Sequence, residues 1–421
     1  MTETSPPGSE PPPAVAPVVK ANVADGRWNR LRRKGWFYWV SVLAIALLGI
    51  YLSHLLEARG PWIEARYIIH QGLQSLDPRK PYVKDTVLVL IGNDEYWKGE
   101  LARRVPFKRD YLARLLIRLD MAEPAVIAVD FNLRSPVGDG SLREHPAYQE
   151  ETQTLLETVK SVSSRRPVIL PLTIAFDARG RYLSESDIHS GFDWGDSAKN
   201  VRFGYIALSF DSRRVPVSLN LVNRGPTDSF ALAIVRAFRP QALEGQRTDG
   251  SLPFGSYLPS EKFPQHSAGT VLTTNTADLK EKVSGRVVII GGIWNQFAYE
   301  RGRQIDSYLT PVGTIPGALI HANNVEALLD HRTTPPMPRR LPDVIEFGFV
   351  ILGAVIFTLQ RRWYIRVLTA IGLCLGLIVL SYVFLRNLGV YFDAIVPLAM
   401  IAGHSILDEA REWEIRGKLD R

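Results

Sequence analysis

The chain has 421 residues, of which 46% are hydrophobic and 22% are charged, which excludes a fully disordered protein and a small disulfide-stapled scaffold. Its single cysteine, Cys374, excludes an internal disulfide and a cysteine-based metal site. The formal net charge is +7, but residues 57–340 carry 36 basic and 32 acidic groups and are close to neutral for their size. Nucleic acid is therefore not an expected partner.

The first strong feature in chain order is an apolar segment, residues 37–56, without a formal charge. At about 1.5 Å rise per residue, this length matches the roughly 30 Å hydrocarbon core of a bilayer. A cluster of Arg and Lys at residues 27–34 precedes it and places residues 1–36, a Pro-rich, disordered and basic tail, in the cytoplasm. We predict an uncleaved anchor here; a cleaved signal peptide is the alternative.

Three further apolar segments near the C-terminus, residues 344–359, 367–385 and 388–407, predict three more membrane helices. The Arg-containing loop between the first two should stay in the cytoplasm. The protein would then be a multi-pass cell-membrane protein (of the inner membrane in a Gram-negative cell). Residues 57–340 would lie outside, and the N-terminus and a short tail, 408–421, would lie in the cytoplasm. Four spans are predicted, and three are the alternative.

Residues 57–340 alternate between continuous apolar runs and amphipathic segments. This pattern predicts an α/β extracytoplasmic domain with a mainly parallel sheet covered on both faces. Irregular segments are expected around 176–202 and 240–268. The predicted strands are 85–94, 125–131, 167–174, 203–211, 270–275 and 286–292. The predicted helices are 59–76, 107–119, 148–162, 229–238 and 320–329.

Acidic residues follow the predicted strands, where parallel α/β sheets usually bind ligands. Asp94 and Asp130 stand at two such ends, and Asp306 follows the Gly291–Gly292 turn further along the chain. The three could share a polar site or a divalent cation, or each could cap a helix or a turn. The spacing is not diagnostic of a metal, so no metal ligand is predicted.

The sequence carries no motif for nucleotide binding or for Ser-His-Asp catalysis. The turn after residues 286–292 lacks a phosphate-binding glycine pattern, and no G-x-S-x-G sequence accompanies the candidate histidine, His321. We therefore predict a non-enzyme with no cofactor and no catalytic residue.

Several blocks resemble the CHASE family of extracellular sensory domains, in its second type. The early blocks are LVLIGNDEYW, RVPFKRDYLARLLIRL and AVIAVDFNLRSP, and the later ones are VVIIGG, Asp306-Ser-Tyr-Leu-Thr310-Pro311 and the Pro-Gly that precedes His321-Ala. The resemblance covers residues 60–335, with one anchor before the domain and three spans after it. The chain has Asn93-Asp94 where the family has an acidic pair, and Val105-Pro106 where it has Trp-Pro.

The resemblance implies a membrane-anchored sensor that binds a small molecule or a protein outside. Asp94, Asp130, Asp306, Thr310 and His321 are the expected ligand-binding residues. Such relatives usually continue into a kinase or cyclase domain, whereas only about fourteen residues follow the last apolar segment here. We therefore expect a separate cytoplasmic effector. A non-enzymatic assembly or envelope docking protein is the main alternative, an extracytoplasmic hydrolase is a third, and a homodimer remains open.

Overall fold

The computed structural model describes residues 31–32, 34–57, 60–76, 85–104, 107–133, 146–184, 188–189, 191–208, 214–254, 256–297, 302–335, 340–360, 362–388 and 395–419. The chain divides into two compact units. The first contains Met1–Ser53, Glu346–Cys374 and Ala394–Arg421, and the second contains His54–Ile345 and Leu375–Asp393. The predicted C-terminal tail lies partly, and the N-terminal tail almost wholly, outside the described residues.

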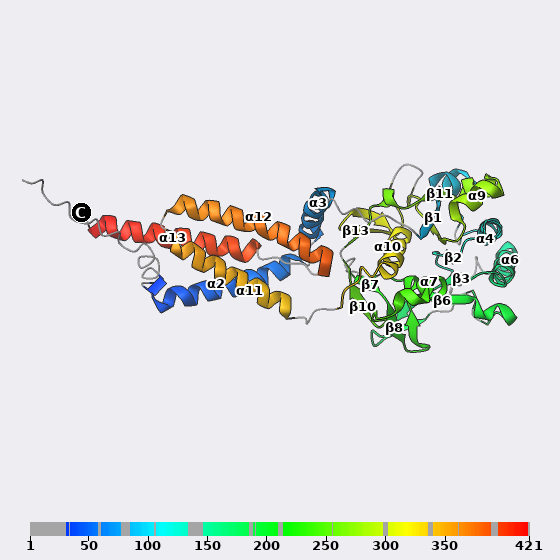
Figure 1. Ribbon diagram of the computed structural model, residues 1–421, viewed down its shortest axis with the longest axis horizontal. Coiled ribbons are helices and arrows are strands. Elements are labelled where there is room, and N and C mark those ends of the chain that lie inside the picture. Colours follow the sequence, from blue (N-terminus) through cyan, green and yellow to red (C-terminus); the bar gives the residue numbers. More distant parts are fainter. Residues whose placement is uncertain are drawn as a thin grey trace, which may run out of the picture. The chain divides into compact units, whose positions relative to one another are not determined.

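The second unit is built around a parallel sheet with the strand order β11-β1-β12-β2-β3-β6 (Figure 1). Its strands are β1 (Thr86–Ile91), β2 (Val126–Val129), β3 (Val168–Leu172), β6 (Val201–Tyr205), β11 (Gln265–Ser267) and β12 (Val287–Gly292). The three central strands are buried on both faces, which explains why their sequences read as continuous apolar runs. The predicted α/β fold with a mainly parallel sheet is confirmed.

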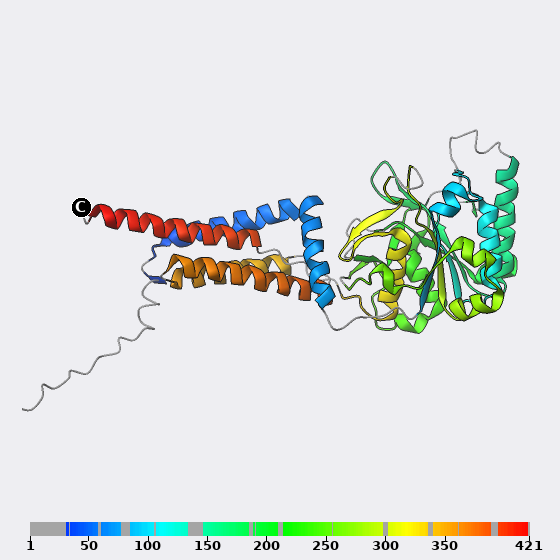
Figure 2. The same ribbon diagram turned by 90° about the horizontal axis from the view of Figure 1, so that it is seen from above.

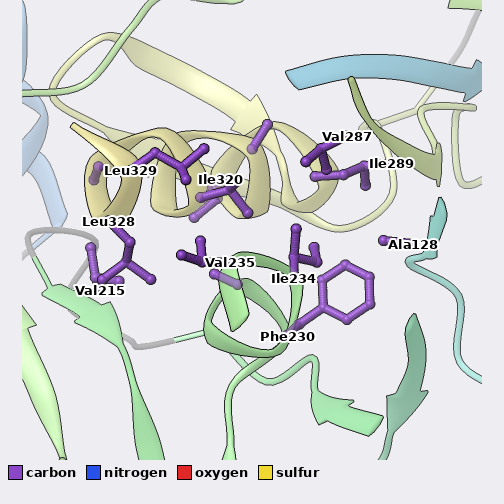
Figure 3. Packing of buried hydrophobic residues seen from close by; sticks show 14 of the residues in the cluster. Ala128, Val215, Phe230, Ile234, Val235, Val287, Ile289, Ile320, Leu328 and Leu329 are labelled. Atoms are coloured by element: carbon purple, nitrogen blue, oxygen red, sulfur yellow. The ribbon is translucent and has the colours of Figure 1, made fainter. Parts of the chain in front are cut away.

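Helices cover both faces of this sheet (Figure 2). One face packs against α4 (Arg109–Asp120), α6 (Pro146–Ser163), α8 (Ala268–Thr273) and α9 (Thr276–Val283). The other face packs against α7 (Phe230–Phe238) and α10 (Gly317–Leu329). Figure 3 shows this second core, where Phe230 and Ile234 of α7 meet Ile320 of α10 beside strand residues Ala128 and Ile289. Side chains thus alternate between the two cores along each central strand.

Small elements fill the connections of the second unit. Antiparallel pairs are formed by β4 (Ile174–Phe176) with β5 (Tyr182–Ser184), β7 (Arg214–Pro216) with β10 (Ser251–Pro253), β8 (Ser218–Leu221) with β9 (Gly225–Asp228), and β13 (Ser307–Thr310) with β14 (Gly313–Pro316). Short helical turns are η1 (Asp94–Lys98), η2 (Gly195–Lys199), η3 (Pro240–Leu243) and η4 (Ser260–Lys262), and α3 (Gly60–Leu76) begins the unit. The segments expected to be irregular therefore contain paired strands.

The strand predicted over 270–275 is wrong, because residues 268–273 form helix α8. Ser267 caps this helix, since its hydroxyl accepts a hydrogen bond from the backbone N–H of Thr270 at 3.1 Å. Asn275 then caps α9 by accepting from Asp278 N at 2.9 Å. Two caps eight residues apart outweigh the β propensity of a short Val-Leu-Thr-Thr run.

The first unit contains long apolar helices. They are α2 (Trp36–Glu57), α11 (Leu341–Leu359), α12 (Trp363–Leu388) and α13 (Ile395–Leu419), of which α2, α11 and α12 extend into the second unit. Three of them, α2, α11 and α12, are long and apolar enough to cross a membrane, and α13 has a shorter apolar part, Ile395–Leu407. The first part of the predicted span 388–407 lies mostly outside the described residues.

Polar contacts join the helices of the first unit. The Tyr38 hydroxyl of α2 lies 2.9 Å from Thr358 Oγ1 of α11, and Ser41 Oγ lies 3.1 Å from His404 Nε2 of α13. Arg366 of α12 donates to the backbone carbonyl of Ser405 at 2.8 Å. Each buried polar group in an apolar bundle costs free energy unless it finds a partner, so these contacts specify which helices are neighbours.

The approach of α10 to the sheet depends on Gly291 of β12. A Cβ atom at Gly291 would lie 2.4 Å from the Cβ of Ala318, which is closer than two carbons can pack. Gly291→Val should therefore lower the free energy of unfolding by about 1–3 kcal/mol, because α10 would be pushed off the sheet. Urea unfolding of the full chain in detergent, followed by tryptophan fluorescence, measures the change.

The matched control is Gly72→Ala in α3, where an added Cβ meets no atom within 4 Å. That variant should be neutral or slightly more stable, since alanine favours a helix over glycine. Equal stability of Gly291→Val and the wild type would contradict the packing described for α10.

Candidate functional site

The candidate site lies at the carboxyl end of the central strands, on the face covered by α7 and α10. Asp130 follows β2 directly, and its backbone N–H donates to the Ile290 carbonyl of β12 at 2.8 Å, which extends the sheet by one residue. The alternation along β2 directs Asp130 to the same face as Val126 and Ala128, toward α10. The sheet thus delivers a carboxyl group to the first turns of a buried helix.

His321 of α10 meets this carboxyl group. Its Nε2 atom lies 3.6 Å from Asp130 Oδ1, and the two side chains are only 4% and 7% exposed. The imidazole also forms a hydrogen bond with the backbone of Ile206 and packs edge-on against Phe230, with ring centroids 5.0 Å apart. The structure therefore brings two of the candidate residues together, and contacts with Ile206 and Phe230 hold the imidazole between them.

Burial determines the protonation of the pair. Desolvation raises the pKa of Asp130 to about 8, with a smaller contribution from the negative charge of Asp306. Desolvation also lowers the pKa of His321 to about 4, opposed by its hydrogen bond with Ile206. Between these two values the pair therefore holds one proton, whichever partner carries it.

Asp306 adds a second carboxyl group beside the pair. It precedes β13 and adopts a left-handed backbone conformation, with φ of 47°. A Cβ atom at Gly317 would lie 2.0 Å from Asp306 Oδ2, so only glycine at the start of α10 leaves room for this carboxylate. The position at a helix N-terminus favours a negative charge, and Asp306 itself remains exposed to solvent.

Tyr308 completes the group and was missed by the sequence analysis. Its hydroxyl donates to Asp306 Oδ1 at 2.7 Å. Partial desolvation raises the pKa of Asp306, and this hydrogen bond opposes the rise. Desolvation and the same hydrogen bond raise the pKa of Tyr308. Tyr308 stands two residues after Asp306, on strand β13, and this short separation in the chain is the signal that could have identified the tyrosine.

Two of the predicted site residues, Thr310 and Asp94, lie outside the group formed by Asp130, His321, Asp306 and Tyr308. Thr310 is fully buried in the turn between β13 and β14, where its hydroxyl donates to the Gly313 carbonyl at 2.6 Å and accepts from Val312 N at 3.3 Å. It holds the hairpin in shape. Asp94 is exposed at the start of η1. The contacts of Thr310 lie within the hairpin turn, and Asp94 stands after β1 rather than after β2.

Glu95, next to Asp94, has the structural role at this strand end. Its carboxylate accepts from Gly92 N at 3.0 Å, at the end of β1, and from Gly269 N at 3.2 Å, in the first turn of α8. Sequence reasoning missed this residue, because two adjacent acids after a strand look equivalent until the helix that one of them caps is known.

Stacked aromatic rings cover the same strand ends on the opposite face. Tyr96 stacks on Trp294 with ring centroids 4.3 Å apart, and Phe107 stacks on Phe131 at 4.9 Å. Asn295 joins the ends of β1 and β12, because its N–H donates to Asn93 Oδ1 at 2.7 Å. This layer covers the strand ends on the side opposite α10.

The cluster can bind hydrogen-bonding ligands and exchange a proton. Asp130, His321, Asp306 and Tyr308 supply carboxyl, imidazole and phenol groups within one small region. Among the residues that the structure describes, no group of three or more His, Cys, Asp or Glu side chains has the geometry to hold a metal ion.

The comparisons with known proteins give one match. The family model described as the CHASE2 domain matches residues 40–359 of this chain. No curated protein and no solved structure matches the chain.

The Asp130–His321 pair predicts a specific dependence of stability on pH. In the unfolded chain the same two groups hold one proton between their ordinary pKa values, 3.8 and 6.5, and none above 6.5. The folded pair keeps its proton up to about pH 8. Folded and unfolded states therefore differ in bound protons only between about pH 6.5 and 8, where stability falls as pH rises, by about 2 kcal/mol in total.

Urea unfolding of the full chain in detergent, measured across pH 5–9, tests this. Asp130→Asn should remove the decline between pH 6.5 and 8, while Asp196→Asn, a change at an exposed acid of η2, should keep it. Asp306→Asn should shift the decline to lower pH, because it removes the charge that helps to raise the pKa of Asp130. A decline that persists unchanged in Asp130→Asn would contradict the assignment.

Proposed function

Because the chain belongs to the CHASE2 family of extracellular sensory domains, we propose that it is a membrane-anchored sensor. In this proposal residues 57–340 lie outside the cytoplasm, and their state passes through the membrane helices to a separate cytoplasmic partner. The observation that supports it most is the buried Asp130–His321 pair with an accessible carboxylate, Asp306, at its side.

A sensor needs a site whose occupancy changes the relative stability of two arrangements. The pair meets this requirement, because burial holds it at one proton and any ligand that donates or accepts a hydrogen bond there changes that balance. A small polar molecule or a polar loop of a protein has the groups to do so. The ligand enters past Asp306 and Tyr308, the exposed and half-buried members of the cluster.

The chain also links this site directly to a membrane helix. His321 lies on α10, which ends at Leu329, and α11 begins at Leu341. Only eleven residues separate the two helices, so a shift of α10 along its axis is passed along a short covalent connection to a candidate span. Coupling of this kind requires only that the ligand bind the two positions of α10 with different affinity.

The orientation of the protein gives the first test. In a variant with Cys374→Ser and Asp196→Cys, a membrane-impermeant maleimide should label intact cells, because Asp196 is exposed on the proposed outer domain. In the matched variant with Cys374→Ser and Ser9→Cys, label should appear only after the cells are opened. The reverse pattern would overturn the proposal, since the domain would then face the cytoplasm.

Signal transmission gives the second test. A nitroxide label at Ala410→Cys on α13, in a Cys374→Ser background, reports motion beyond the apolar part of that helix. In proteoliposomes a step from pH 6.5 to 8 on the domain side should change the spectrum in the otherwise wild-type chain and in Asp196→Asn. The change should be absent in Asp130→Asn, because the titrating carboxyl group is removed.

An unchanged spectrum in all three chains would contradict transmission. That outcome would favour the alternative, in which the domain only docks to other envelope proteins.

A further inference from the structure

A cavity of about 320 Å³ lies in the second unit, away from the Asp130–His321 pair. It is bounded by one side of α3, the loop before β11, the turn of the β13–β14 hairpin and the last turns of α12. Its lining includes His70, Gln74, Lys262, Val312, Tyr382 and Arg386. None of the residues predicted as a ligand site lines it.

Helix α3 has an exposed apolar stripe and buried polar side chains, the reverse of a helix in water. Ala65, Ile68, Ile69, Gly72 and Leu76 repeat at helical spacing and are all exposed, with Ile68 67% and Leu76 77% accessible. Arg66 and His70, on another side of the same helix, are buried. In a helix surrounded by water the apolar stripe would be the covered one. The exposed stripe therefore fits a helix that lies at the surface of a bilayer.

The covalent connection agrees with that position. Only Ala58 and Arg59 separate the end of the candidate span α2 from the start of α3. Trp62 and Arg66 form a cation–π contact 5.7 Å long in the first turns, and aromatic and basic side chains are typical of the membrane–water interface. The apolar stripe cannot be far from the lipid into which the preceding helix inserts.

The cavity carries the complementary polar groups. Gln71 and Ser75 stand beside the apolar stripe on α3 and line the cavity, so its rim borders that stripe. Two permanent cations, Lys262 and Arg386, oppose one carboxylate, Glu261, in the lining. Tyr382 packs against His70 with ring centroids 5.7 Å apart and forms part of an apolar wall with Leu385 and Leu258.

We propose that this cavity binds the head group of an anionic phospholipid from the outer leaflet. A volume of about 320 Å³ is at the small end of ligand pockets, enough for a glycerophosphate group but not for two acyl chains as well. The chains then lie along the exposed stripe of α3. The phosphate is bound by Lys262 and Arg386 through charge-assisted hydrogen bonds. The leaflet assignment rests on the proposed orientation of the sensor.

The test uses the full chain in dodecyl maltoside micelles, where no orientation is imposed, so its result does not depend on the orientation of the sensor. Dihexanoyl phosphatidylglycerol, below its micellar concentration, should raise the melting temperature, and dihexanoyl phosphatidylcholine should do so less. Inorganic phosphate at the same concentration should have no effect. Phosphate as effective as the lipid would overturn the lipid assignment and indicate a site for free anions.

Two variants locate the effect in the cavity. Lys262→Gln with Arg386→Gln should weaken binding of the lipid at least tenfold, whereas Lys199→Gln, at an exposed position of η2, should not. Ser75→Trp should block the cavity from an exposed position, where the serine hydroxyl donates to the Gly72 carbonyl of its own helix. Equal stabilisation of Ser75→Trp and the wild type by the lipid would overturn the proposal.

Discussion

The second unit depends on one constraint, the complete burial of helix α10. Every residue from Gly317 to Leu329 is buried, although the helix carries a histidine, two asparagines and a glutamate. Burying a polar group costs free energy unless it finds a partner, and His321, Asn323 and Glu326 each contact a segment outside the helix. The helix is thus a core element and a set of polar anchors at the same time.

The anchors connect parts of the chain that are far apart in sequence. Asn323 accepts from Leu258 N at 2.7 Å and donates to the Leu258 carbonyl at 3.2 Å, which ties down the loop before β11. Glu326 accepts from Asp85 N at 3.2 Å at the entry to β1, and burial raises its pKa. His321 Nε2 lies 3.6 Å from Asp130 Oδ1 at the exit from β2. A movement of α10 would disturb all three contacts at once. A single concerted shift of the helix should therefore cost less free energy than several separate local rearrangements.

The sequence analysis predicted the parts that depend on local pattern. Continuous apolar runs identified β1, β2, β3 and β12, and the spacing of Tyr111, Leu112, Leu115, Leu116 and Leu119 identified α4. Asp130 was a candidate because it follows a buried strand, and His321 was a candidate because it stands in a block that resembles the family. Their mutual distance could not be derived, since it depends on where α10 crosses the sheet.

The errors have a common origin in contacts between distant segments. The run at 270–275 was read as a strand because of its β propensity. Two helix caps, Ser267 and Asn275, outweigh that propensity, and Ser267 is positioned because the residues up to it pair with β1. Glu95 was overlooked because its partner, the start of α8, was not recognised as a helix. The hairpin that carries Tyr308 was missed because each of its strands has only four residues.

That hairpin is the element shared by the two candidate binding sites. Asp306 and Tyr308 lie at one end of it, beside the Asp130–His321 pair, and Val312 lies at the other end, in the wall of the lipid cavity. Its two strands are held in register by the turn at Thr310, so the hairpin moves as one piece. Ile315 of the second strand packs into the core formed with α10. If both proposed sites are occupied, a ligand that repositions Asp306 would also alter the cavity, and by thermodynamic reciprocity a bound lipid would alter the affinity at the buried pair by the same factor. In the proposed sensor, a bound lipid would then contribute to the free-energy difference between the two arrangements of the domain.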